Sequence, residues 1–260
     1  MIGGRGFVGS AIVHELINRG DNVWVPSRDD HSIFSQPLGD VIYAAGVTSD
    51  FRSRVLETGE AHICLLKTIL EKATFRSLIY LSSTRVYGDG ESYEEAPIQV
   101  NPLSLEHVYN LTKLTGEALC LHSGRPTKIV RLSNVIGEDE AAGHFFSMLL
   151  HEGQETGNII LRSSPQSEKD YIWIDDVVEL VLSIMTRGKE NIYNVASGKN
   201  ISHAEVLEWI HKLTGALWSC DNTYKPVIYR NIDIEKIKNE FGFVPKNPFE
   251  AFFKRKTEGR

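Results

Sequence analysis

The sequence is poor in cysteine. Its 260 residues include only Cys64, Cys120 and Cys220, which are widely spaced and form no Cys-x-x-Cys pair. Three cysteines at such distances indicate neither a disulfide framework nor a zinc site. We therefore expect no bound metal and a reducing, cytoplasmic environment.

The chain also lacks long apolar runs and an excess of positive charge. No stretch approaches the ~18 apolar residues that span a bilayer, and Met1 to Gly4 show no signal-peptide pattern. The net charge is −6 and the pI is near 5.9, the opposite of the balance expected for binding to a nucleic-acid backbone. With 42% hydrophobic and 24% charged residues, the composition is that of a globular protein. We expect neither a membrane nor a nucleic acid as a partner.

A tyrosine and a lysine stand four residues apart in a predicted helix over 105–122, which has apolar residues at steps of three and four. At this spacing Tyr109 and Lys113 share one helix face. A tyrosine with a pKa of about 10 is a poor base, but a neighbouring ammonium and a nicotinamide cation would lower that pKa. Taken alone, the pair is more typical of a solvated helix face, and the motifs around it are what favour a functional role.

Three glycines precede the first predicted helix. Gly3, Gly6 and Gly9 have GxxGxxG spacing, and the helix that follows carries an apolar face and ends at Gly20. Such a turn brings the backbone close to a pyrophosphate at a helix N-terminus. The alternative is a plain glycine turn. We interpret the turn as a dinucleotide site, whose predicted contacts are Gly3, Arg5, Gly6, Phe7, Val8 and Gly9.

The strand that should precede this turn is almost absent, because only Met1 and Ile2 stand before Gly3. A missing central strand would expose ladder groups and apolar surface. We therefore favour an N-terminus that is truncated relative to the natural start, as a hypothesis.

The second predicted strand, 22–26, ends at Ser27 and Arg28. An acidic residue at this strand end would bind the adenosine ribose hydroxyls and select NAD. A small hydroxyl and a guanidinium fit a 2′-phosphate better, so the sequence weakly favours NADP over NAD. A solvated loop charge is the alternative for Arg28.

Further buried strands are predicted at 40–46 and 77–82. The first ends in Ala44, Ala45 and Gly46, whose small size lets a flat cofactor pass close to the chain. The interval before it is too short for a helix–strand unit, so the third strand is expected to be shortened or lost. The second continues into Ser83, whose hydroxyl would lie at the carboxyl edge where ligands bind. An amphipathic helix is predicted over 56–73.

The later part of the chain changes in pattern. We predict strands at 128–133, 158–162 and 191–196, helices at 144–152, 177–185, 202–213 and 233–241, and Asp175 and Asp176 as helix caps. The predicted division assigns 1–137, with a contribution from 159–190, to a dinucleotide-binding domain. Residues 138–158 and 191–260 would form a smaller part that docks on it with a cleft between.

Seven motifs occur in the order of a known family. They are Gly3/Gly6/Gly9, Ala44-Ala45-Gly46, Leu81 to Gly88, Tyr109-x-x-x-Lys113, Arg131-x-x-Asn134-Val-x-Gly137, Asp170-Tyr-Ile-x-x-Asp175-Asp176-Val and Tyr193 to Gly198. Through them the chain resembles an extended short-chain dehydrogenase/reductase of the nucleotide-sugar epimerase/dehydratase group. The resemblance covers nearly the whole sequence. Each motif alone is weak to moderate, and seven in order are strong.

The resemblance implies an α/β fold: a Rossmann-type, doubly wound parallel sheet that binds NAD or NADP, with a small C-terminal α+β substrate-binding domain. By position, Tyr109 would be the general base, Lys113 would hold the nicotinamide ribose, and Ser83 would take the hydroxyl role. Thr84, Asn134 and Arg230, and less surely Lys225, would contact a nucleotide-linked sugar. Pairing through the 56–73 and 105–122 helices would give a homodimer.

Two departures from the family pattern bear on the reaction. Sugar dehydratases of the group carry Asp-Glu after the active hydroxyl, where this chain has Thr84 and Arg85, so dehydration is disfavoured. The family's asparagine on the helix after Gly46 is matched by His62, which is either an acid/base group or a packing histidine.

The resulting prediction is an NAD(P)-dependent nucleotide-sugar epimerase or reductase that acts by hydride transfer at a sugar hydroxyl or keto carbon. The alternative is a non-catalytic NAD(P)-binding sensor or regulator of the same fold, since fold does not fix function. A sensor has no need of Ser83, Tyr109 and Lys113 together, which favours the enzyme. A truncated, inactive product is a third interpretation.

Overall fold

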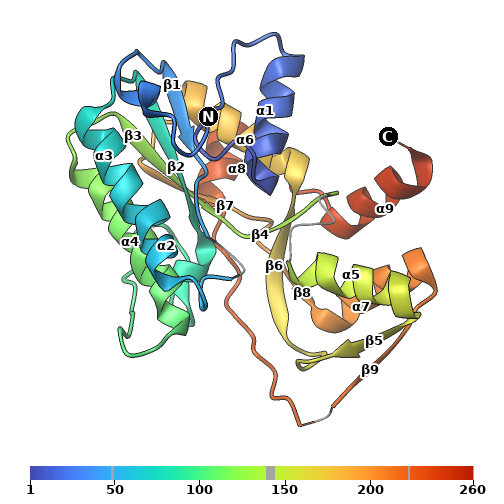
Figure 1. Cartoon of the computed structure of the whole chain (residues 1–260). Coiled ribbons are helices and arrows are strands. Elements are labelled where there is room, and N and C mark those ends of the chain that lie inside the picture. Colours follow the sequence, from blue (N-terminus) through green and yellow to red (C-terminus); the bar gives the residue numbers. More distant parts are fainter. Residues whose placement is uncertain (48–49, 139–143, 222, 260) are drawn as a thin grey trace.

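A four-stranded parallel sheet organises most of the chain. The computed structural model describes residues 1–47, 50–138, 144–221 and 223–259. The strands are β1 (Asp40–Tyr43), β2 (Ser77–Ser83), β3 (Thr127–Leu132) and β7 (Ile192–Val195), in the order β1-β2-β3-β7. All pairs are parallel, so the four carboxyl ends meet at one edge of the sheet (Figure 1). The predicted Rossmann-type fold is confirmed.

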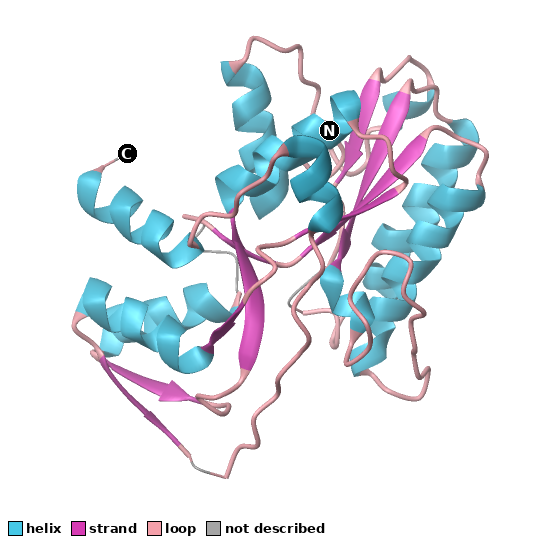
Figure 2. Ribbon diagram, turned by 180° about the vertical axis from the view of Figure 1, so that it is seen from behind, coloured by secondary structure: helices cyan, strands magenta, loops and turns pink. Residues whose placement is uncertain are grey.

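Helices cover both faces of this sheet, as Figure 2 shows. One face carries α2 (Val55–Gly59), a π-helical segment (Glu60–Cys64), α3 (Leu65–Lys72) and α4 (Glu106–His122), and the other carries α1 (Phe7–Asn18), α6 (Ile174–Arg187) and α8 (Glu235–Phe241). The period of two in β2 explains the layers: Leu78 and Tyr80 enter the core beside α3 and α4, while Ile79 and Leu81 enter the opposite core. The predicted helices 56–73 and 105–122 are confirmed, the first with a π-helical segment.

The smaller part contains two short sheets and three helices. Its elements are β4 (Asn134–Ile136), β6 (Glu168–Trp173) and β8 (Asn200–Ser202) in one sheet, β5 (Asn158–Leu161) and β9 (Leu217–Cys220) in the other, and α5 (Phe145–Thr156), α7 (His203–Thr214) and α9 (Pro248–Glu258). One continuous apolar core runs from Ile79 and Val130 in the large sheet to Phe249 and Phe252 in α9. The smaller part therefore packs against the sheet body through this core.

The predicted domain division is wrong at two strands. β7 pairs with β3 in the large sheet, although 191–260 was assigned to the smaller part. β5 pairs with β9 in the smaller part, although residues from 159 on were assigned to the dinucleotide-binding domain. Short apolar strands do not encode their pairing partner, which explains both errors. Residues 139–143 of the predicted 138–158 stretch lie outside the described residues.

The N-terminal edge of the sheet is reduced to one residue. Ile2 bridges to Tyr43, with bonds from Ile2 N to Ile42 O (3.0 Å) and from Ala44 N to Ile2 O (2.9 Å). The strand predicted at 22–26 does not form, and the Met1 amino group donates a hydrogen bond to Trp24 O in this segment. A strand needs a ladder partner, and none of the described residues forms a ladder with 22–26. The expected loss of a strand between this segment and β1 is confirmed, since a 3₁₀ turn (His31–Phe34) stands there.

The aspartates at the start of α6 do not cap it. The N-cap is Trp173, without a side-chain cap bond, and both aspartates lie in the first turn. Asp175 pairs with Arg255 and Asp176 with Lys246, so they join α9 and the preceding loop to the positive end of the α6 dipole. Among the residues that the structure describes, no helix has the length and hydropathy needed to span a membrane.

Candidate active site

Three buried side chains follow each other along one face of α4. Tyr109, Lys113 and Glu117 stand at steps of four, and each is less than a tenth exposed. The Lys113 ammonium donates to Leu81 O (2.9 Å) and lies 5.0 Å from the centre of the Tyr80 ring. The predicted Tyr–Lys face therefore packs against the carboxyl half of β2 instead of facing solvent.

Ser83, the last residue of β2, meets the phenol of Tyr109 in a hydrogen bond. Burial raises the pKa of Tyr109 to about 12, and the Ser83 bond and the positive charge of Arg85 only partly oppose this effect. The expected lowering of this pKa by Lys113 is not found in the structure, because burial is the larger effect. The Lys113 ammonium is 5.9 Å from the Tyr109 ring centre and directs a proton to a backbone carbonyl instead.

Lys113 itself is strongly perturbed. Burial lowers its pKa to about 7, although the nearby Glu117 carboxylate favours the charged form. Lys113 thus gains or loses its proton near neutral pH. Its ammonium lies on the same helix face as Tyr109, whose phenolate it would stabilise. Perturbed groups of this kind concentrate at functional sites.

His62 lies in the π-helical segment and is fully buried. Its Nδ1 is 2.8 Å from Thr112 Oγ1, which donates its own proton to Tyr109 O. Because that hydroxyl proton is used, His62 Nδ1 must be the donor, and Nε2 is left as a bare acceptor. Nε2 has no hydrogen-bond partner among the described residues.

The free nitrogen of His62 faces Gly46, just beyond β1. A Cβ built on Gly46 would lie 2.8 Å from His62 Nε2 and 3.6 Å from Lys113 Nζ. Burial and the charge of Lys113 lower the His62 pKa to about 2, so the imidazole is neutral. A neutral imidazole disfavours an acid/base role for His62. A packing role alone does not explain why its Nε2 is an acceptor without a partner beside Lys113.

The glycine turn fits the pyrophosphate of a dinucleotide. Gly3 has φ +76°, and a Cβ there would lie 2.5 Å from Ala45 N; one on Gly9 would lie 2.3 Å from Gly3 O. A Cβ on Gly6 would meet only Gly3 O, at 3.6 Å, so that side of the turn is open. Gly6 is the N-cap of α1 without a side-chain cap, and the first-turn N–H groups are available to an anion.

The other predicted cofactor contacts are arranged around this turn. Ala44 and Ala45 pack on Gly3, and Gly46 faces Lys113 and His62. Val25 lies against Gly4, so the segment that ends in Ser27 and Arg28 runs beside the turn, and both of these side chains are exposed. Arg5, Phe7 and Val8 continue from the turn into α1.

The predicted substrate-contacting residues are less closely gathered. Thr84 follows Ser83 directly, and its hydroxyl is 3.4 Å from Leu132 O. Asn134 is exposed at the start of β4 and donates to Asp170 O (2.8 Å). Arg230 is mostly exposed and pairs with Glu91, away from the Tyr109 cluster. Lys225 is exposed.

Sequence reasoning missed the buried polar network behind the site. Arg131 on β3 forms an ion pair with Glu117 (2.6 Å) and donates to Tyr87 Oη and Glu94 O. Ser82 also donates to Glu117, and Tyr87 donates to Asn194 on β7. A carboxylate one further turn along the Tyr–Lys face was the signal that could have revealed it.

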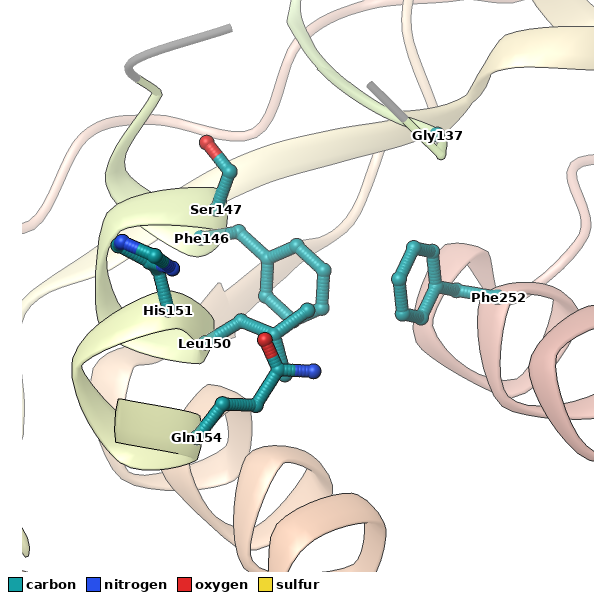
Figure 3. Close-up of a pocket in the computed structure, with 7 residues that line it drawn as sticks. All are labelled: Gly137, Phe146, Ser147, Leu150, His151, Gln154 and Phe252. Carbon is teal, nitrogen blue, oxygen red and sulfur yellow. The ribbon is translucent and has the colours of Figure 1, made fainter. Parts of the chain in front are cut away.

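Two cavities lie away from the catalytic cluster. The small one in Figure 3 is where Phe146 and Leu150 of α5 approach Phe252 of α9, with Gly137 at its edge. A larger groove of about 710 Å³ runs between α1, α6 and α9 and is lined in part by Phe7. Neither is lined by Ser83, Tyr109 or Lys113.

With this geometry established, comparison with known proteins defines the class. The model of the NAD dependent epimerase/dehydratase family matches residues 1–196, and the chain belongs to this family. The matched range contains the glycine turn, β1, β2 and the Tyr109–Lys113 face of α4.

Individual relatives are distant. An uncharacterized UDP-glucose epimerase, YtcB, of Bacillus subtilis is 24% identical over 181 residues, which cover 65% of this chain and 56% of that protein. A CDP-abequose synthase of Salmonella muenchen is 24% identical over 277 residues, covering 97% and 92%. A Bacillus cereus UDP-glucuronic acid 4-epimerase solved with NAD has a TM-score of 0.83 at 17% identity, covering 100% and 98%. None of these three is described as a sensor.

Proposed function

We propose that the protein is an NAD(P)-dependent nucleotide-sugar epimerase or reductase that transfers a hydride at a sugar hydroxyl or keto carbon. The observation that carries the proposal is the meeting of Ser83, Tyr109 and Lys113 at the carboxyl end of β2, next to the loop that packs on the glycine turn. Family membership and the sugar nucleotides named for the relatives support it.

The residues have distinct tasks in this proposal. Ser83 and Tyr109 would hold the sugar oxygen between them, and the Tyr109 phenolate would take its proton as the carbonyl forms. When bound, the nicotinamide supplies the hydride acceptor and donor. Lys113 would hold the nicotinamide ribose and stabilise the phenolate. Since burial holds the pKa of Tyr109 at about 12, the phenolate requires this added positive charge.

Three observations refine the reaction, the cofactor preference and the assembly. Thr84 and Arg85 supply no carboxyl group for elimination, so epimerisation or reduction is proposed in preference to dehydration. NAD and NADP both remain open, with the weak preference for NADP resting on Ser27 and Arg28. A homodimer is supported by exposed leucines on or beside the α2 and α4 helices, namely Leu56, Leu105 and Leu121.

The test is a cofactor titration followed by a substrate screen. NAD⁺ and NADP⁺ are titrated by quenching of protein fluorescence, and UDP-, dTDP-, GDP- and CDP-hexoses are then incubated with the loaded protein. An epimerase interconverts sugars without net NAD(P)H formation, whereas a reductase consumes NAD(P)H in proportion to product. Chromatography of the sugar nucleotides and absorbance at the nicotinamide band separate the two.

Variants decide whether the named residues are responsible. Tyr109→Phe should lower turnover by a factor of about 10³ or more and leave the cofactor dissociation constant within about threefold. Tyr93→Phe, which removes an exposed phenol, is the matched control. Full activity in Tyr109→Phe would exclude the assignment, and tight cofactor binding without turnover on any sugar nucleotide would favour a sensor.

A further inference from the structure

Two arginines stand beside the catalytic tyrosine. The guanidinium carbon of Arg85 lies 5.7 Å from the Tyr109 ring centre and 4.9 Å from that of Phe51. The guanidinium carbon of Arg52 lies 4.6 Å from the Phe51 ring centre. Both arginines pair with one carboxylate, Glu106. Two positive charges thus share a single negative charge next to the candidate active site.

Arg85 has donors to spare. Its bonds to the backbone oxygen and the carboxylate of Glu106 both come from Nη2. Nε and Nη1 have no acceptor among the described residues, and a guanidinium can bind a carboxylate through two parallel bonds. The exposed pair with Glu106 is of the weak kind, so a ligand carboxylate can compete for the guanidinium.

A third cation, Lys169 of the smaller part, stands near enough for the charges of both arginines to act on it. Lys169 on β6 is partly buried, and its ammonium lies 5.4 Å from the Phe145 ring centre. Within the described residues it has no carboxylate or other hydrogen-bond partner. Burial first, and then the charges of Arg85 and Arg52, lower the Lys169 pKa. A partly buried ammonium without a partner is stabilised when an anion joins it.

We propose that Arg85 and Lys169, assisted by Arg52, form a subsite for the carboxylate of the sugar, so that the substrate is a nucleotide-linked hexuronate. This inference rests on the proposed function and names its substrate class. Arg85 lies two residues after Ser83 and beside the Tyr109 ring, so an anion bound there is close to the reacting carbon. In a hexuronate oxidised at C4, the carboxylate is on the neighbouring C5, whereas the diphosphate is on C1, across the ring.

Sugar nucleotides that differ only in the carboxylate test the inference. Dissociation constants of UDP-glucose and UDP-glucuronate, with the dTDP-sugar pair as a second set, are measured by calorimetry on the cofactor-loaded protein. The wild type should bind the hexuronate at least about tenfold more tightly than the hexose, since a charge-assisted bond to a poorly solvated cation is involved.

Charge-removing variants identify the residues responsible. Arg85→Gln and Lys169→Gln should each weaken hexuronate binding by about tenfold or more and change hexose binding by less than about threefold. Arg85→Lys should weaken hexuronate binding by an intermediate factor, because lysine keeps the positive charge but cannot form two parallel hydrogen bonds to a carboxylate. Arg76→Gln, an exposed arginine paired with Asp40 at the opposite end of β2, is the matched control and should change neither constant.

Three results would overturn the inference. Equal losses for hexose and hexuronate would mean that the cations bind the diphosphate. Turnover of UDP-glucose without a preference for the hexuronate would refute the uronate subsite while leaving the proposed function intact. Binding of neither sugar, with cofactor bound, would refute both proposals.

Discussion

The middle of the large sheet and its N-terminal edge differ in how extensively their strands are paired. At the middle, β2 pairs with β3 over six residues, and buried polar groups such as Arg131 and Glu117 satisfy each other. At the edge, Ile2 forms a single bridge, and the 22–26 segment has no ladder at all. Ser83 and Tyr109, the residues proposed for proton transfer, lie at the middle of the sheet. Ser27 and Arg28, proposed to bind the adenosine end of the cofactor, lie at its edge.

This contrast indicates where stability and function are coupled. Tyr109 and Lys113 lie on the buried face of α4, and Ser83 ends a strand with core on both sides, so their geometry depends on the core. Ser27 and Arg28 are exposed on irregular backbone and are positioned by few contacts. We therefore expect substitutions at the middle to change folding energy strongly, and substitutions at the edge to change only cofactor preference.

The largest expected effect comes from the buried ion pair. Glu117→Ala should lower the free energy of unfolding by about 3–5 kcal/mol, because Arg131 would remain charged and buried without its partner. Glu71→Ala, which breaks the exposed Lys67–Glu71 pair, should cost no more than about 1 kcal/mol. Urea denaturation measures both. Similar unfolding midpoints for the two variants would contradict the comparison.

Lys113 should make the middle of the sheet less stable than an apolar side chain would. Its pKa falls from 10.5 to about 7 on folding, so between these values the unfolded chain binds more protons. The free energy of unfolding should therefore rise as the pH increases from 7 to 9. Lys113→Met should abolish turnover, remove this part of the pH dependence and stabilise the protein at pH 7 by on the order of 1–3 kcal/mol.

Urea denaturation at several pH values, with Lys67→Met as an exposed control, measures the effect. A pH slope that is identical in wild type and Lys113→Met would show that Lys113 keeps its proton in the folded state.

The middle of the sheet was also the more predictable region. The apolar period of two in 77–82 and of three to four in 105–122 predicted β2 and α4, and the motif spacing predicted that Ser83 would lie near Tyr109. These signals are local, and the site requires only that β2 and α4 pack against each other. The 22–26 segment has an equally strand-like sequence, but strand formation depends on a partner that local pattern cannot supply.

Energetic properties were harder to predict than positions. The pairing of Tyr109 and Lys113 suggested a lowered tyrosine pKa, yet burial proved the larger effect and raised it. Arg131, Glu94 and Asn194 converge from separate parts of the sequence, so no spacing reveals their network. The role of Arg85 depends on its distance from Tyr109 and on Lys169, which only the folded chain defines.

His62 tests the contacts at the boundary of the two regions, where Gly46 follows β1. His62→Phe should weaken cofactor binding about tenfold, because it removes the free acceptor at Nε2 beside Lys113 while keeping a planar ring against Tyr109. His62→Gln offers a carbonyl oxygen near that position and should stay within about threefold of wild type. Fluorescence titration with NAD⁺ measures both. Equal binding by the two variants would support a packing role alone.

The smallest expected effect is at the edge itself. Arg28→Ala should weaken NADP⁺ binding by about three- to fivefold, the value of one exposed ion pair, and leave NAD⁺ binding unchanged. The loss should diminish at high salt, since the side chain is exposed. Arg19→Ala, an exposed arginine at the far end of α1, serves as the control. Loss of NAD⁺ and NADP⁺ binding to the same extent would mean that Arg28 supports the backbone of the 22–28 segment rather than a 2′-phosphate.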